Sequence, residues 1–154
     1  MREITTTAPP LAVTDTRTDV TGTRTDRSYL ELVAAPGAVP RARRHTRHML
    51  AAWKLGHLAD DAELVVSELL TNAVRATPGM PPAAPVALYL AAEHDRLTVM
   101  VWDACPQPPV RRPHDDDAVT GRGLEIIEAL SDRCGSCVPD HGGKIVWAWF
   151  DLPE

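Results

Sequence analysis

The chain has 154 residues, a formal net charge of −5 and 44% hydrophobic residues. These values indicate one globular domain with its own core, and they argue against a dedicated nucleic-acid binder, which is usually basic overall. No apolar run is long enough to span a membrane, and the N-terminus has no apolar signal core, so we expect a cytoplasmic protein without a membrane partner. The odd number of cysteines indicates reduced thiols.

The first segment, residues 1–27, is rich in Thr with scattered Pro, Asp and Arg, and it has no sustained apolar period. Such a composition buries too little apolar surface to offset the entropy lost on ordering, so we predict a disordered tail. Residues 28–154 form the predicted domain. Its first element is a strand over Tyr29–Val33, which Pro36 and Gly37 end.

Two helices are predicted next. The first has Pro40 in its first turn and a stop at Gly56. The second has a marked start, because Asp60 followed by Glu63 resembles a capping box in front of an apolar run. We expect this second helix to end near Ala76, just before a proline and a glycine.

Glu68 and Asn72 are the most informative pair on the second predicted helix. Residues four apart share a helix face, and this pair borders the apolar stripe. A carboxylate beside an amide oxygen suits a hard cation such as Mg²⁺ and can orient a water or hydroxyl. Taken alone, the pair is better explained by an ordinary exposed Glu and Asn, and only the signals further along the chain reverse that preference.

The second half of the domain is predicted to contain two hairpins, with a loop and a helix between them. The expected elements are strands over 86–90 and 97–102, a loop over 106–120, a helix opened by Gly121-Arg122-Gly123, and strands over 134–138 and 144–152. This order predicts the α+β class, a two-layer sandwich in which helices cover one face of a mixed, mainly antiparallel sheet.

Three separated signals occur in order along the chain: Glu68 with Asn72, then Asp103 after a strand, then Gly121 to Leu124 at a helix start. Together they resemble the ATPase domain of the histidine kinase, gyrase and MutL group (GHKL type, Bergerat fold), and most closely its anti-sigma factor serine kinases. The resemblance covers residues 28–152. It implies that Asn72 is the Mg²⁺ ligand, that Glu68 is the general base and that Asp103 accepts a hydrogen bond from the adenine amine of ATP.

The resemblance also assigns two glycine boxes. Gly121-Arg122-Gly123-Leu124 matches the second box, where backbone N–H groups at a helix start approach the phosphates. The first box reads D-x-G-x-G in the family, whereas here Cys105 stands at its first glycine, two residues after Asp103. Ala76 and Ile145 are further departures, because many relatives have a histidine and a base-facing threonine near these positions.

The implied function is an ATP-binding and Mg²⁺-binding serine/threonine kinase of the anti-sigma factor type. It would phosphorylate a small antagonist protein and control a sigma factor, so the implied partners are a sigma factor and an anti-sigma factor antagonist, with no direct contact to nucleic acid. The alternative is a non-catalytic, nucleotide-sensing module of the same fold that sequesters a partner. A severed histidine kinase catalytic domain and a DNA-binding regulator are further alternatives, and a homodimer is an open possibility.

The segment after Pro40 is distinctly basic. Its charged residues are Arg41, Arg43, Arg44, Arg47 and Lys54. This face is either a solvated helix surface or a contact surface for an acidic protein partner.

Cys134 and Cys137 form a CxxC motif. A tetrahedral zinc site needs a second pair of ligands, and the candidates Cys105, His114 and His141 are scattered along the chain. We therefore prefer small, buried or half-buried thiols as the interpretation.

Overall fold

The computed structural model describes residues 25–77, 84–107 and 123–153. The elements in chain order are β1 (Asp26–Val33), α1 (Ala38–Ala52), the 3-10 helix η1 (Gly56–Leu58), α2 (Ala59–Ala76), β2 (Pro85–Ala92), β3 (Arg96–Asp103), α3 (Gly123–Leu130), β4 (Arg133–Cys137) and β5 (Lys144–Asp151). Residues 1–24 of the expected tail, and most of the expected loop, lie outside the described residues. The expected domain boundary at residue 28 is two residues late, because β1 already begins at Asp26.

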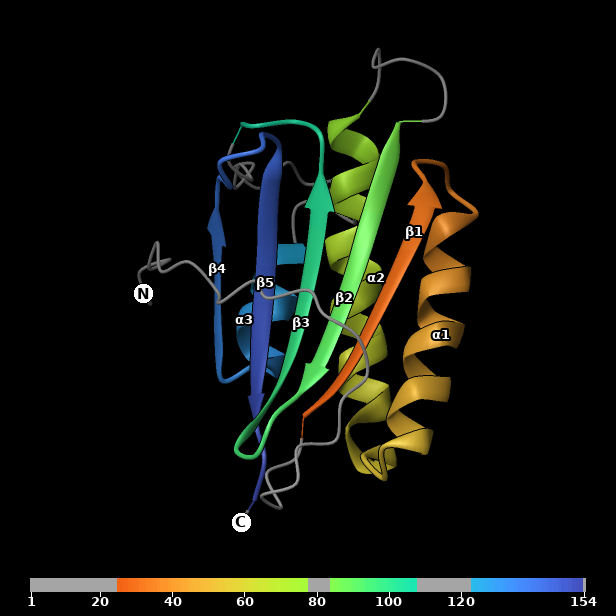
Figure 1. The fold of residues 1–154 in the computed structure, drawn as a ribbon, viewed down its shortest axis with the longest axis vertical. Coiled ribbons are helices and arrows are strands. Elements are labelled where there is room, and N and C mark those ends of the chain that lie inside the picture. The colour runs from red at the N-terminus through yellow and green to blue at the C-terminus, as the bar shows by residue number, and fades with distance from the viewer. Residues whose placement is uncertain (1–24, 78–83, 108–122, 154) are drawn as a thin grey trace.

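The five strands form one sheet in the order β1-β2-β3-β5-β4, and each neighbouring pair is antiparallel. Helices α1, α2 and α3 all lie on one face of this sheet, as Figure 1 shows. The predicted α+β sandwich is therefore confirmed. Because β3 pairs with β5, the end of one strand meets the start of the other, and Asp103 lies directly opposite Lys144.

The hydrophobic core fills the space between the sheet and the helices. Alternate residues of each strand point towards the helices, as the period of two in a strand requires. The largest fully buried side chains of this core include Leu50, Val65, Val66, Leu69, Leu70, Val86, Leu88, Leu90, Leu97, Val99 and Ile127. Helix α2 contributes most of its length to this core, so its orientation against β3 is firmly set.

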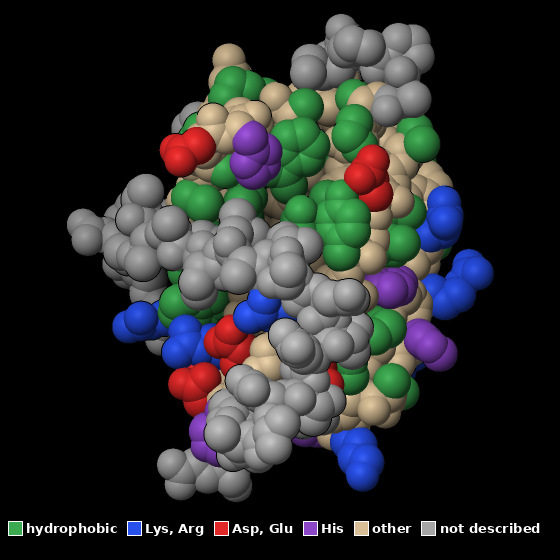
Figure 2. All heavy atoms as spheres, viewed as in Figure 1, with side chains coloured by type: hydrophobic (Ala, Val, Ile, Leu, Met, Phe, Trp, Pro, Cys, Tyr) green, Lys and Arg blue, Asp and Glu red, His purple; other side chains and the backbone are tan. Residues whose placement is uncertain are grey.

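Aromatic and other apolar side chains line the face of the sheet that faces away from the three helices. A second cluster on this face joins Met100, Ile145 and Trp147. The rings of Trp147 and Trp149 lie 4.6 Å apart between their centroids. Figure 2 shows hydrophobic side chains gathered on this face.

Helix α1 ends earlier than predicted. Pro40 is its third residue and still lies in the first turn, but the expected stop at Gly56 is wrong. Lys54 takes the left-handed conformation with a φ of 60°, and the N–H of Leu55 donates to the carbonyl oxygen of Leu50 at 2.7 Å. In this kind of helix-ending turn the left-handed residue is usually glycine, and here it is Lys54.

The expected capping box at the start of α2 is also wrong. The helix begins at Ala59 and has no side-chain cap. Arg47 of α1 instead donates to both acidic residues, at 2.7 Å to Asp60 and by an ion pair to Glu63. The two carboxylates therefore join the helices rather than cap one of them. The predicted end of the helix at Ala76 is confirmed.

Candidate functional site

Glu68 and Asn72 of α2 lie against Gly123, the first residue of α3. A Cβ built on Gly123 would lie 2.7 Å from Oε2 of Glu68 and 3.7 Å from both Oδ1 and Nδ2 of Asn72. A side chain at this position would press on the Glu68 carboxylate, so the close approach depends on glycine. The structure thus brings together one carboxylate, one amide and the start of a helix.

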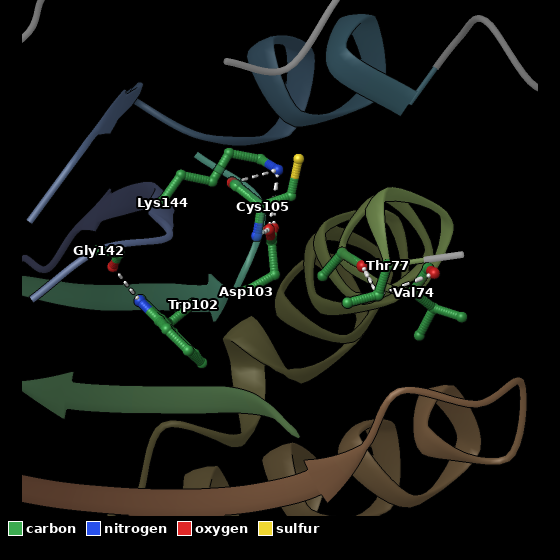
Figure 3. Close-up of polar contacts among 8 residues, drawn as sticks. Val74, Thr77, Trp102, Asp103, Cys105, Gly142 and Lys144 are labelled. Carbon is green, nitrogen blue, oxygen red and sulfur yellow. Dashed lines mark hydrogen bonds and ion pairs between the residues drawn. The ribbon is translucent and has the colours of Figure 1, made fainter. Parts of the chain in front are cut away.

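Helix α2 holds this pair at the edge of the core. Glu68 and Asn72 are half-buried, whereas Leu69 and Ala73 beside them are buried. At the end of the helix, the Thr77 hydroxyl donates to the carbonyl oxygen of Ala73 at 2.6 Å and lies 3.1 Å from that of Val74 (Figure 3). The last turn is therefore closed by a side chain, which limits fraying next to the site.

Asp103 is bound by Lys144 and by the backbone that follows it, as Figure 3 shows. The Lys144 Nζ lies 3.0 Å from Oδ1 and 2.9 Å from Oδ2 of Asp103, and 3.4 Å from the carbonyl oxygen of Cys105. The Cys105 N–H donates to Oδ1 of Asp103 at 2.9 Å. One ammonium group therefore holds the end of β3, the start of β5 and the first residues of the following loop together.

This ion pair is almost completely removed from solvent. Asp103 is 1% exposed and Lys144 is 4% exposed. Burial raises the pKa of the Asp103 carboxyl above its usual range, while the Lys144 ammonium and the Cys105 N–H oppose that rise. An isolated buried carboxylate would be costly, so each charge depends on the other for its place in the interior.

The turn before β5 positions Lys144. Gly143 has a φ of 72°, and a Cβ built on it would lie 2.7 Å from Cε2 of Trp102 and closer still to the carbonyl oxygen of Asp103. The indole N–H of Trp102 donates to the carbonyl oxygen of Gly142 at 3.0 Å. The turn therefore rests directly on the end of β3, and this contact sets Lys144 opposite Asp103.

Ile145 stands near the position at which many relatives have a base-facing threonine, but here it lies on the face of the sheet away from the helices. Lys144 instead points to the helix side, because neighbouring residues of a strand point to opposite faces. The sequence interpretation missed this lysine, although it lies in the same period-two set as Val146 and Ala148, which belong to the core. A charge on the core side of a strand was the signal that could have found it.

Of the other predicted site residues, Gly121 and Arg122 lie outside the described residues. Leu124 is half-buried and packs against the core, which anchors the first turn of α3. Cys105 is half-buried, and its recorded contacts with Asp103 and Lys144 use its backbone. Cys105 stands where the family has a glycine, and its backbone N–H binds the carboxylate of Asp103.

The CxxC cysteines point to opposite faces of β4. Cys134 packs against the core beneath the helices, whereas Cys137 packs against the cluster on the other face. The two thiols therefore cannot bind the same ion. Within the described ranges, no group of three or more His, Cys, Asp or Glu residues is placed to hold a metal ion.

The basic residues of α1 divide into two kinds. Arg47 is used in the contact with α2, whereas Arg41, Arg43 and Arg44 are exposed on the helix surface. Among the helices that the structure describes, none combines the length and the apolar character needed to cross a bilayer.

An antiparallel sheet with helices on one face agrees with the fold expected from the resemblance to GHKL-type ATPase domains. A family model described as histidine kinase-like ATPase domain matches residues 32–150. The chain therefore belongs to the histidine kinase-like ATPase family.

Comparison with solved structures agrees on the fold. The chain is similar to the crystal structure of the RsbU and RsbW domains of Rv1364c from Mycobacterium tuberculosis, with a TM-score of 0.61 and 19% sequence identity. The match covers 83% of this chain and 33% of that one, so this chain spans about a third of the length of the solved protein. No curated protein matches the sequence.

Proposed function

We propose that the chain binds Mg-ATP and acts as a regulatory serine/threonine kinase of the anti-sigma factor type. The observation that carries this proposal is the approach of Glu68 and Asn72 to Gly123, at the start of α3. A carboxylate, an amide oxygen and the free N–H groups of a helix start suit a metal-bound phosphate chain. Membership of the ATPase family supports ATP as the ligand.

In this proposal each residue has a separate task. The Asn72 side-chain oxygen is a Mg²⁺ ligand, and the N–H groups at Gly123 hold the phosphates by hydrogen bonds and by the helix dipole. A Mg²⁺ ion held by Asn72 would supply positive charge to offset the negative charge of the transferred phosphoryl group. Asp103, at the end of β3, accepts the adenine amine and thereby sets the position of the nucleotide.

Glu68 orients the hydroxyl that attacks and takes its proton. Its carboxylate is half-buried and adjoins Gly123, so it lies beside the proposed phosphate position. A base must lie within hydrogen-bond reach of the proton that it removes, and this placement supports that role. The acceptor is a Ser or Thr of a small antagonist protein, and the sigma factor is the second partner in the proposal. The exposed arginines of α1 offer a contact surface for an acidic partner.

Calorimetric titration with Mg-ATP tests the nucleotide site. We expect wild type to bind and Asn72→Ala to lose about ten-fold or more in affinity, because the metal ligand is removed. Asp61→Ala is the matched control, since Asp61 is an exposed acidic residue at the other end of the same helix. Absence of binding in wild type, or equal affinity in Asn72→Ala, would refute the proposed site.

A transfer assay separates the kinase from the non-catalytic module. Wild type is mixed with γ-labelled ATP and purified candidate antagonist proteins, and label on the antagonist is measured. We expect Glu68→Gln to retain Mg-ATP binding and to lose transfer, because the amide cannot take a proton. Tight nucleotide binding with no transfer by wild type would favour the sequestering module, which Cys105 in place of the family glycine also supports.

A further inference from the structure

We propose that Lys144 is a second base-contacting residue, whose ammonium donates a hydrogen bond to the ring acceptor next to the amine that Asp103 binds. The inference rests on the proposed nucleotide site and adds a specificity-determining residue to it. It is based on two hydrogen-bonding positions of the buried pair: an acceptor position of Asp103 that has no donor among the described residues and an N–H of Lys144 that makes only a weak hydrogen bond.

The Asp103 carboxylate has one acceptor position to spare. An ionised carboxylate has about four lone-pair positions. Oδ1 accepts from the Cys105 N–H and from Lys144, and Oδ2 accepts from Lys144. Within the described part of the chain, one lone pair of Oδ2 therefore accepts no hydrogen bond, and an amine that reaches it can bind without displacing the lysine.

The Lys144 ammonium has one donor that is easily exchanged. Its three N–H groups match two short contacts to Asp103, at 3.0 and 2.9 Å, and one contact of 3.4 Å to the carbonyl oxygen of Cys105. The last distance is beyond the usual range for a nitrogen donor, so this hydrogen bond is weak. A ligand acceptor can replace it at small cost while both contacts to Asp103 remain.

The spare acceptor and the exchangeable donor are neighbours. Nζ of Lys144 lies 2.9 Å from Oδ2 of Asp103, so the two positions are adjacent. Adenine has an amine donor at C6 directly beside the ring acceptor N1, and this edge is the complement of the pair. A carboxylate alone reads only the amine, whereas the pair also requires the adjacent acceptor.

A purely structural role for Lys144, balancing the charge of Asp103, makes a different prediction. In that case the lysine contributes to folding, and its removal changes the affinity for every nucleotide by the same factor. A contact between Lys144 and N1 instead changes the affinity only for ligands that possess N1. A double-mutant cycle separates the two roles: Lys144 is changed in the protein, N1 is changed in the ligand, and the affinities of all four combinations are compared.

The experiment measures dissociation constants of ATP and 1-deaza-ATP, with Mg²⁺ present, for wild type and Lys144→Met. We expect wild type to prefer ATP by about ten-fold or more, since a hydrogen bond to a charged donor is lost in the analogue. In Lys144→Met the ratio should fall to about one, because no donor remains to sense N1. As a control, purine riboside triphosphate, which lacks the amine, should bind more weakly than ATP to both proteins.

The neutral double variant Asp103→Asn/Lys144→Met protects the test against loss of folding, since it leaves no unpaired buried charge. Its ratio for ATP and 1-deaza-ATP should also be about one. Suppose that wild type binds ATP. The role of Lys144 would then be overturned if the preference for ATP over 1-deaza-ATP were the same in wild type and in the variants, or if wild type showed no preference. Absence of ATP binding in wild type would instead remove the proposed function and this inference together.

Discussion

The Glu68 carboxylate reaches to 2.7 Å from the place that a Cβ on Gly123 would occupy. The two residues are far apart in sequence and belong to different helices, α2 and α3, which pack against each other. Their approach brings the proposed catalytic base next to the proposed phosphate position, at the edge of the core. A substitution at Gly123 therefore tests the proposed function without changing the core.

Gly123→Ala should impair the site but not the fold. The added methyl group meets only the end of a flexible side chain, which can move, and alanine is favoured over glycine in helices by up to about 1 kcal/mol. We expect an unchanged or slightly higher melting temperature, with Mg-ATP affinity about ten-fold lower because the Glu68 carboxylate is displaced towards the phosphates. Gly56→Ala is the control, since a Cβ there meets no atom within 4 Å. Wild-type affinity in Gly123→Ala would contradict the expectation.

The sequence was sufficient to predict the elements whose pattern is local. Helix α2 and the hairpin of β2 and β3 follow from periodicity and from clear turn residues. The end of α1 was missed because Lys54 adopts a conformation that favours glycine. The capping box was misread because Asp60 and Glu63 bind Arg47, a contact made only when two helices pack.

The same distinction applies to the candidate site. Glu68 and Asn72 were found because their spacing of four is a local feature of one helix. Lys144 was missed because its role depends on the register of β3 against β5, which pairs it with Asp103 across 41 positions of sequence. A register between distant strands leaves only a weak local signal, and here that signal was a lysine in the core-facing set of β5.

The two glycines of the last turn should differ in their tolerance of alanine. Gly143→Ala combines a positive φ with a collision against backbone and against Trp102, so we expect a loss of about 3 kcal/mol or more in the free energy of unfolding. Gly142→Ala also has a positive φ but meets no atom within 4 Å, so its loss should be smaller, about 1 to 2 kcal/mol. Urea unfolding measures both, and equal losses would show that the turn does not rest on β3 as described.

Asp103→Asn should destabilise the protein more than the double variant Asp103→Asn/Lys144→Met. The single change leaves the Lys144 ammonium 4% exposed without its counter-charge, and breaking a buried ion pair from one side costs about 3 to 5 kcal/mol. Removing both charges avoids that penalty. Denaturant midpoints decide the matter, and a double variant less stable than the single would contradict the pairing. Binding data on Asp103→Asn alone therefore need a parallel measurement of folding.

Arg47 should contribute more to the stability of the fold than Asp60, its exposed partner, or Arg44, an exposed arginine of the same helix. It joins α1 to α2 through Glu63, whose side chain is 11% exposed, and through Asp60, whose side chain is 92% exposed. We expect Arg47→Met to lower the urea midpoint more than Asp60→Ala, because only the Glu63 contact is shielded from water. Arg44→Met, on the same helix, is the control and should change little. The reverse order would show that the contact between the helices does not depend on this arginine.

His45 should make stability depend on pH. Its Nε2 lies 2.6 Å from the Ser28 hydroxyl oxygen, across the contact of α1 with β1, and burial followed by the nearby His48 lowers the pKa of His45 below its ordinary value of 6.5. Between the lowered pKa and 6.5, the unfolded chain binds a proton that the folded protein does not, so stability rises with pH in this window and is lost as pH falls through it. We expect the urea midpoint to decrease from about pH 7.5 to about pH 5 by more in wild type than in His45→Gln. His57→Gln, at an exposed histidine, should keep the wild-type slope. If wild type and His45→Gln lose the same stability, the imidazole is not held in its neutral form by the fold.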